Sequence, residues 1–202
     1  MSLFEYDENI RKNDSIILCG VDEAGRGPLA GDVYAAAVVF ESGVVIEGIN
    51  DSKKLSEKKR ELLYDEIIAK AKAYCIATAS VEEIDELNIL NATYLAMKRA
   101  VEGLGITPDL SLIDGNRLPP ELPCNAETII KGDGTSASIA AASILAKVAR
   151  DRYMKTIAEK YPEYQFEKHK GYGTKLHTEL ILEHGPSKVH RKTFLRKLYN
   201  EK

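Results

Sequence analysis

Apolar runs of strand length alternate along this chain with longer stretches of helical periodicity. The runs 16–21 and 33–40 predict β-strands, and the second is almost wholly apolar, as expected of a strand covered on both faces. The run 43–49 predicts a third strand, which would make the start of the chain rich in antiparallel hairpins. Further strands are predicted at 73–80, 110–113 and 127–130.

Amphipathic spacing predicts helices between and after these strands. Ser56 is the expected N-cap of the first helix, with an incomplete capping box because Lys59 stands where a Glu is needed. A loop is expected at 164–174. The predicted helices are 57–72, 81–87, 90–102, 136–160, 175–184 and 189–200.

The order of these elements predicts the fold class. Strands at the start, then strands alternating with helices, indicate an α/β fold with a mixed β-sheet flanked by helices. A length of 202 residues suits one substantial core, so 1–202 is expected to be a single domain whose part from about 160 to 202 is helical and basic.

The charge is unevenly distributed along the chain. Residues 1–144 carry 14 Lys and Arg against 24 Asp and Glu, whereas residues 145–202 carry 14 against 7. A basic C-terminal third is typical of a nucleic-acid footprint. An uneven but merely solvated surface explains the same numbers, so charge alone leaves both interpretations open.

Composition narrows the class of protein further. Hydrophobic residues make up 44% and charged residues 29% of the chain, as in an ordinary globular protein. No apolar run reaches the roughly 18 residues that span a membrane, and the acidic segment 1–8 lacks a signal-peptide core. Cys19, Cys75 and Cys124 are odd in number and far apart, which indicates neither disulfides nor a zinc site and favours the cytoplasm.

Acidic side chains follow three of the predicted strands. Asp22 and Glu23 end the first strand, Asp114 follows 110–113, and Asp133 lies just past 127–130. Ligands of α/β sheets gather outside strand ends, and clustered carboxylates repel one another unless cations neutralise them.

Carboxylate oxygens suit a hard cation such as Mg²⁺. Each acid taken alone could equally be an ordinary turn residue, since Asp-Gly is a common turn pair. The four together favour a two-metal site for in-line displacement at phosphorus.

A glycine-bracketed arginine follows the first acids directly. Gly25 and Gly27 let the backbone approach a polar substrate closely, while Arg26 suits either a phosphate contact or a solvated loop position. Ser52 and Lys53 precede a predicted helix, where a hydroxyl, amides and a cation can meet a phosphate.

The long predicted helix carries a second set of candidate phosphate contacts. Ser143 and Lys147 share one stripe of that helix and should flank the acids, although a solvated polar face is the alternative. His169, His177, His184 and His190 follow no zinc spacing, and a proton-shuttle role for His169 is not favoured.

Six blocks of residues follow one another in a fixed order and together cover most of the chain. They are 21–31, 50–55, Ile113-Asp114-Gly115-Asn116, 131–148, His169-Lys170-Gly171-Tyr172-Gly173-Thr174 and His190-Arg191-Lys192-Thr193-Phe194. In this order they resemble the ribonuclease HII family, also called type 2 ribonuclease H. Members of that family often have a proline before the second strand, where this chain has Asp32, a departure that we expect to have only a local effect.

The resemblance implies a ribonuclease H-like fold and a role for each block. The acids Asp22, Glu23, Asp114 and Asp133 would hold two Mg²⁺ or Mn²⁺ ions. The loop Gly25-Arg26-Gly27 would read the ribose 2′-hydroxyl through its backbone, the group that distinguishes RNA from DNA.

The exposed aromatic Tyr172 would pack at the sugar just past the ribonucleotide and help to select an RNA–DNA junction. An ordinary packing tyrosine is the alternative. The chain lacks the long N-terminal substrate-binding domain of ribonuclease HIII, which favours HII.

The implied activity is endonucleolytic. The protein would cut the RNA strand of RNA–DNA hybrids and DNA duplexes at embedded ribonucleotides, leaving 3′-hydroxyl and 5′-phosphate ends, in ribonucleotide removal and primer removal. We expect a monomer with no obligate protein partner and no membrane association. A DNA nuclease or strand transferase with a similar acid cluster, and a non-catalytic RNA–DNA binding module, are the rival hypotheses.

Overall fold

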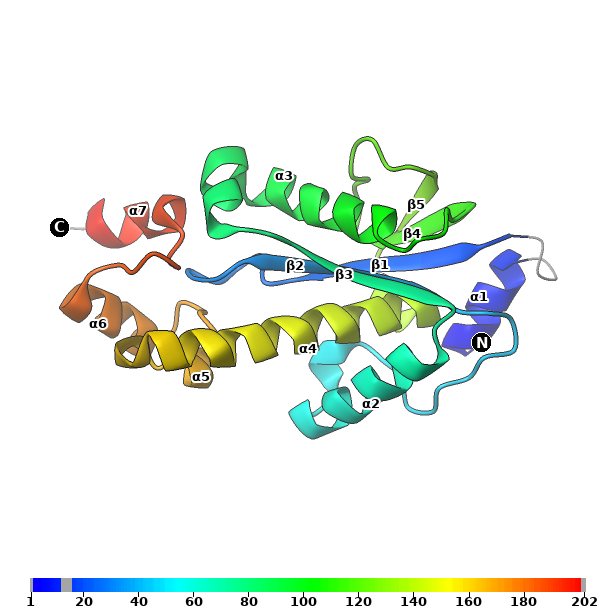
Figure 1. The fold of residues 1–202 in the computed structure, drawn as a ribbon, viewed down its shortest axis with the longest axis horizontal. Helices are drawn as coiled ribbons and strands as arrows, with labels where there is room; N and C mark the ends of the chain where they lie inside the picture. The colour runs from blue at the N-terminus through cyan, green and yellow to red at the C-terminus, as the bar shows by residue number, and fades with distance from the viewer. Residues whose placement is uncertain (1, 12–15, 201–202) are drawn as a thin grey trace.

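A five-stranded mixed sheet forms the centre of the protein in our computed structural model, which describes residues 2–11 and 16–200. The described part leaves out residues 1, 12–15 and 201–202. The predicted single domain 1–202 includes these residues. The sheet order is β3-β2-β1-β4-β5, with β1 antiparallel to β2 and parallel to β4 (Figure 1). The strands are β1 (Leu18–Ala24), β2 (Val33–Val39), β3 (Ala73–Ala79), β4 (Leu110–Asp114) and β5 (Asn125–Ile129).

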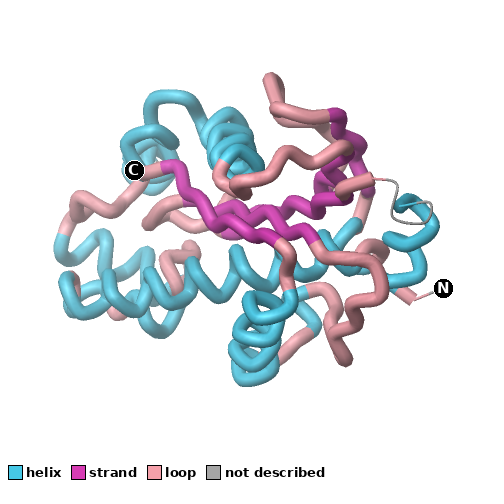
Figure 2. The backbone as a smooth tube through the Cα atoms, turned by 45° about the vertical axis from the view of Figure 1, so that its right-hand side comes forward, coloured by secondary structure: helices cyan, strands magenta, loops and turns pink. Residues whose placement is uncertain are grey.

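Helices cover both faces of this sheet (Figure 2). One face packs on α3, and the other packs mainly on α4, with α2 and α1 beside it. The helices are α1 (Leu3–Arg11), α2 (Glu57–Lys70), α3 (Val81–Glu102), α4 (Ala137–Lys160), α5 (Phe166–His169), α6 (Lys175–His184) and α7 (Lys192–Asn200), with 3₁₀ turns η1 (Ser52–Lys54), η2 (Gly132–Gly134) and η3 (Pro162–Tyr164). The predicted mixed sheet with flanking helices is therefore confirmed.

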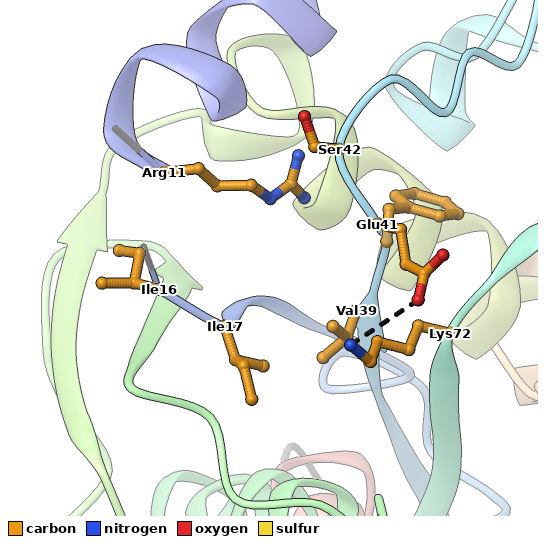
Figure 3. Close-up of a pocket in the computed structure, with 8 residues that line it drawn as sticks. Arg11, Ile16, Ile17, Val39, Glu41, Ser42 and Lys72 are labelled. Atoms are coloured by element: carbon orange, nitrogen blue, oxygen red, sulfur yellow. Dashed lines mark ion pairs between the residues drawn. The ribbon is translucent and has the colours of Figure 1, made fainter. Parts of the chain in front are cut away.

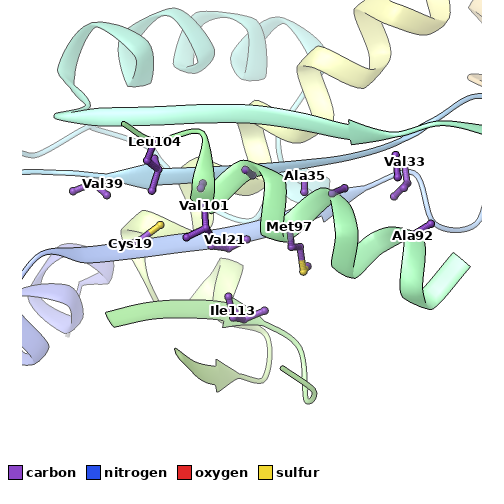
Figure 4. Packing of buried hydrophobic residues seen from close by; sticks show 14 of the residues in the cluster. Cys19, Val21, Val33, Ala35, Val39, Ala92, Met97, Val101, Leu104 and Ile113 are labelled. Carbon is purple, nitrogen blue, oxygen red and sulfur yellow. The ribbon is translucent and has the colours of Figure 1, made fainter. Parts of the chain in front are cut away.

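The apolar strand β2 contributes to the core on both faces, as its sequence predicts. Val33, Ala35 and Val39 point towards α3, where they meet residues such as Met97 and Val101 (Figure 4). The alternate residues, which include Val38, pack against α2 and α4. Small side chains on this strand let both helices approach the sheet closely.

The first strand continues further than its apolar run. β1 ends at Ala24, so Asp22 and Glu23 lie within the strand, paired with Ala36 and Ala35 of β2. The antiparallel partner β2 supplies the hydrogen-bonding edge that extends the strand through two charged residues, which a hydrophobic pattern does not reveal.

The predicted strand at 43–49 is wrong. This segment forms turns and loop, with Gly43 and Gly48 both at φ +77°, a left-handed conformation that interrupts strand pairing. The free edge of β2 is taken by β3 along its whole length. The apolar residues Ile46 and Ile49 are instead buried against α2 and α4, so their hydrophobicity reflects burial rather than a strand.

Helix ends differ from the predictions in ways that follow from local geometry. The break between 81–87 and 90–102 is present as a kink at Asn88 (φ 67°), whose side chain caps the second half of one continuous helix, α3. The predicted loop 164–174 contains the short helix α5, and α7 begins at Lys192 rather than at 189. The helix α1 was not predicted. Ser56 caps α2 as predicted.

The C-terminal helices α6 and α7 pack with the end of α4 around a third apolar cluster. Between them the chain returns to the sheet side of the molecule, where His190 forms a β-bridge with Ala30. None of the helices within the described residues is long and apolar enough to cross a membrane.

Candidate active site

Strand register places Asp22 and Asp114 side by side. The parallel pairing of β1 with β4 ends at Val21 opposite Ile113, so Asp22 and Asp114 are the next residues on neighbouring strands. Asp133 reaches the same point from η2, which lies between β5 and α4. One carboxylate oxygen of each of these three residues lies within 4.8 Å of the others.

Main-chain groups orient these carboxylates. The amide of Gly132 donates to Asp114 Oδ1 at 2.6 Å, and the amide of Glu23 donates to Asp22 Oδ1 at 2.7 Å. A Cβ at Gly132 would lie 2.5 Å from Ile139 Cδ1 and 3.2 Å from Asp114 Oδ1, so only glycine fits there without a shift. Main-chain amides thus hold the carboxylates of Asp22 and Asp114 in place.

The fourth predicted acid, Glu23, is adjacent but lies outside that group of three. Successive residues of a strand face opposite sides of the sheet, so Asp22 faces α4 while Glu23 faces α3. The Glu23 carboxylate lies 3.4 Å from Nη1 of Arg26. Its role in holding a metal therefore stays a prediction.

The clustered carboxylates have perturbed ionisation. Burial, and then the charges of Glu23 and Asp114, raise the pKa of Asp22 well above its ordinary value. Burial and the Asp114 charge likewise raise the pKa of Asp133. Buried acids that repel one another favour a bound cation, and an all-oxygen donor set suits Mg²⁺ or Mn²⁺.

A cleft of about 240 Å³ lies beside the acids and contains all eight predicted substrate-contact residues. Ser52 and Ser143, from η1 and α4, meet with their hydroxyl oxygens 2.8 Å apart. Lys53 Nζ lies 3.9 Å from Asp133 Oδ2. The cleft residues are Gly25, Arg26, Gly27, Ser52, Lys53, Ser143, Lys147 and Tyr172, together with Glu23 and Ala24.

Tyr172 forms one wall of this cleft. The residue is 41% exposed, and a Cβ added to Gly27 would lie 3.9 Å from its ring. The loop Gly25-Arg26-Gly27 (the glycine loop) and the aromatic ring therefore face each other. Lys147 Nζ lies 5.9 Å from the ring centroid and donates to Asp151 Oδ1 at 2.7 Å. The wall therefore offers an apolar face with a cation at its edge.

Three arginines that support the cleft were not predicted from sequence. Arg60 donates to the carbonyls of Ser52 and Leu55, and Arg150 donates to those of Ala30, Asp32 and Lys170. Arg191 donates to the carbonyls of Gly25, Arg26 and Pro28. The block 190–194 included Arg191, and the helix stripe that holds Ser143 and Lys147 continues to Arg150, but neither signal assigned a role.

A stack of three buried histidines supports the loop of Tyr172. His177 Nδ1 donates to the Tyr172 carbonyl at 2.9 Å, and His169 Nδ1 accepts from the Gly171 amide. The rings of His169 and His177 stack with centroids 4.2 Å apart, and His177 Nε2 lies 3.1 Å from His190 Nε2. Both ring nitrogens of His169 bond to the main chain, which leaves it in a supporting position.

A second hollow, of about 310 Å³, lies at the opposite end of β1 from the acids (Figure 3). Its charged groups already have partners, since Lys72 pairs with Glu41 at 3.6 Å and Arg11 with Glu8 at 2.6 Å. Nothing there resembles the grouped carboxylates, so the 240 Å³ cleft remains the candidate active site.

A mixed sheet flanked by helices, with grouped carboxylates at the ends of its central parallel strands, is the arrangement of a ribonuclease H-like fold. The model of a family described as Ribonuclease HII matches residues 19–202, and the chain belongs to that family. As a ribonuclease H, the protein hydrolyses the RNA strand of RNA–DNA hybrids.

Individual relatives agree with this assignment. Ribonuclease HII of Caldicellulosiruptor saccharolyticus is 54% identical over 96% of this chain and 95% of its own length. The crystal structure of ribonuclease H2 from Pyrococcus horikoshii OT3 has a TM-score of 0.74 at 27% identity, covering 90% of this chain and 96% of that one. Bst-RNase HIII in complex with Mn²⁺ (TM-score 0.64, 16% identity, 85% and 63% coverage) shares the fold.

Proposed function

We propose that this ribonuclease H also cuts duplex DNA at embedded ribonucleotides and leaves 3′-hydroxyl and 5′-phosphate ends. The observation that carries the proposal is the position of three grouped carboxylates beside a cleft lined by the glycine loop and Tyr172. Groups suited to the phosphodiester and groups suited to its ribose are thereby adjacent. The cellular role we propose is removal of ribonucleotides and primers from DNA, in the cytoplasm, by a monomer without an obligate protein partner.

The acids Asp22, Asp114 and Asp133, with Glu23 beside them, are the proposed ligands of two divalent cations. When bound, such ions supply an activated water and stabilise the leaving oxygen of an in-line displacement. The Mn²⁺ in the related ribonuclease HIII structure supports Mg²⁺ or Mn²⁺ as the metal. The main-chain bonds to Asp22 and Asp114 keep these oxygens oriented.

The remaining cleft residues position the duplex. The backbone of Gly25-Arg26-Gly27 approaches the ribose 2′-hydroxyl, which can donate and accept a hydrogen bond. Tyr172 packs on the neighbouring sugar across the cleft. The paired hydroxyls of Ser52 and Ser143, with the cations of Lys53 and Lys147, hold phosphates on either side of the cut.

A labelled DNA duplex with one ribonucleotide, compared with an all-DNA duplex, tests the proposal with and without Mg²⁺. We expect cleavage at the ribonucleotide only, and only with the metal. The variant Asp22→Asn should lose this cleavage while it keeps its thermal unfolding profile and duplex affinity.

Other outcomes identify the rival functions. Cutting of the all-DNA duplex would indicate a DNA nuclease, and binding without turnover would indicate a non-catalytic module. Metal-dependent cleavage retained in Asp22→Asn would contradict the proposed metal site.

A further inference from the structure

Arg191 is the most completely bonded buried cation in the described part of the molecule. It is 0% exposed, and its side chain makes five hydrogen bonds, one for each guanidinium N–H. Every acceptor is a main-chain carbonyl: those of Gly25, Arg26, Pro28 and, twice, Gly31. No carboxylate of the described residues pairs with it within 4 Å, so its charge is balanced by peptide dipoles.

The main chain around Arg191 is tied to the same loop. The Arg191 amide donates to the Leu29 carbonyl at 2.9 Å, and the Gly31 amide donates to the Val189 carbonyl at 2.8 Å. Residues 189–191 thus lie along the far end of the loop like a short strand, and the Arg191 side chain reaches back beneath 25–28.

The carbonyl bonds decide where the loop amides point. In a trans peptide the C=O of one residue and the N–H of the next point in opposite directions. Because Gly25 and Arg26 direct their carbonyls to Arg191, the amides of Arg26 and Gly27 point away from it. Both residues line the cleft, and neither amide has an acceptor among the described residues.

We infer that Arg191 is a positioning residue for ribose selection: it holds the loop so that the Arg26 and Gly27 amides meet the 2′-hydroxyl. The inference rests on the proposed ribonucleotide recognition and adds the group that enforces it. Arg191 touches no substrate. A lysine would keep the charge but lose most of the five directed donors, because its ammonium carries three donors on a single atom.

The test is the ratio of affinities for a duplex with one ribonucleotide and for the all-DNA duplex, measured in Ca²⁺ to suppress turnover. In Arg191→Lys we expect the ribonucleotide affinity to fall about tenfold, as for one or two hydrogen bonds, and the all-DNA affinity to stay within about twofold. In Arg191→Ala, ethylguanidinium should restore the ratio and ethylammonium should not.

A matched control separates positioning from lost stability. Leu195 is buried in the apolar cluster under the same C-terminal segment, so Leu195→Ala should lower the melting temperature but keep the affinity ratio. An unchanged ratio in Arg191→Lys, or an equal fall in Leu195→Ala, overturns the inference. A wild-type protein without ribonucleotide preference would instead overturn the proposed recognition, and the inference with it.

A measurement on the wild-type protein covers the case in which both Arg191 variants fail to fold. In ¹⁵N spectra, the signals of the Arg26 and Gly27 amides should shift when the ribonucleotide duplex binds and should not shift when the all-DNA duplex binds. The side-chain N–H groups of Arg191 should exchange with solvent more slowly in the ribonucleotide complex than in the all-DNA complex. Unchanged signals from both groups would contradict the role of Arg191.

Discussion

At the scale of single residues, the chemistry of the cleft depends on side chains whose partners are already in place. Asp22, Asp114 and Asp133 are held by main-chain amides or by a tight turn. Ser52 and Ser143 hold each other. Such preorganisation lowers the cost of arranging groups when the substrate arrives. The cleft residues that remain most exposed, such as Tyr172 and Lys53, are those we expect to contact the duplex.

Tyr172 should act through its ring rather than its hydroxyl. Stacking of an aromatic on a nucleotide contributes about 1–3 kcal/mol, so Tyr172→Ala should lower kcat/KM at an embedded ribonucleotide by roughly ten- to a hundredfold. Tyr172→Phe keeps the ring and should retain most of the activity. Steady-state kinetics on the single-ribonucleotide duplex would decide, and equal losses in the two variants would contradict stacking.

Lys147 should contribute a phosphate contact. Its removal in Lys147→Ala should weaken all duplexes alike and reduce the slope of log affinity against log salt by about one. Lys155, two turns further along α4, is paired with Glu57 at 2.8 Å and lines no part of the cleft. Lys155→Ala therefore serves as the control, and its slope should be unchanged. Binding titrations at several salt concentrations measure the slope for each variant. An unchanged slope in Lys147→Ala would exclude the phosphate contact.

At the scale of elements, the start of α4 packs closely against the strand β1. A Cβ at Gly20 would lie 2.1 Å from the main chain of Ser138, so only glycine lets the start of α4 rest on β1. This contact sets the position of Asp133, which lies just before α4, relative to Asp22 on β1. The glycine therefore links the packing of the core to the spacing of the acids.

Gly20→Ala should consequently destabilise the protein by about 3 kcal/mol or more, since overpacking of a close backbone contact forces the helix away from the strand. Gly134→Ala is the matched control, because a Cβ there meets no atom within 4 Å. Urea denaturation of the two variants beside the wild type tests this. A Gly20→Ala protein as stable as the Gly134→Ala protein would show that α4 moves freely.

The sequence predicted most elements because their patterns are local. The continuous apolar run of β2, the cap at Ser56 and the break at Asn88 each depend on residues a few positions apart. The strand predicted at 43–49 was wrong because its apolar residues are buried by α2 and α4, while β3 occupies the edge it would need. Competition for a sheet edge is a tertiary event.

At the scale of the whole molecule, the buried histidines His169, His177 and His190 link the C-terminal segment to the cleft. Their hydrogen bonds require all three rings to be neutral. Burial lowers the pKa of His177 and of His190 to about 4, with the neighbouring histidine adding to the effect. With all rings neutral, His190 Nε2–H can donate to His177 Nε2, and His190 Nδ1 accepts from the Ser187 amide. A proton on either ring removes one of these acceptors.

Stability should therefore fall in acid. The pKa values of His177 and His190 in the folded protein lie below the value of about 6.5 in the unfolded chain, so the unfolded chain binds more protons between about pH 4 and pH 6.5. The free energy of unfolding therefore has its full contribution from these histidines above about pH 6.5. It falls towards pH 4 by about 1.4 kcal/mol per pH unit for each ring.

Comparison with a double variant separates the histidines' contribution to the pH dependence of stability from that of the carboxylates. His177→Gln with His190→Gln should flatten the pH dependence of the unfolding free energy, whereas the exposed His184→Gln should not. Urea denaturation between pH 4.5 and 7.5 measures the difference. Parallel curves for wild type and double variant would show that the stack does not couple folding to pH.

The sequence by itself determined the mixed sheet, most helices and the residues of the candidate site, because periodicity, caps and family blocks are written in the order of residues. Only the tertiary structure decided that Glu23 lies beside the group of three acids rather than within it, since the register of β1 against β2 assigns each residue to one face. It also decided the roles of Arg60, Arg150 and Arg191. The carbonyl partners of Arg150 and Arg191 lie between 20 and 166 positions away in the chain, a distance across which no local pattern carries information.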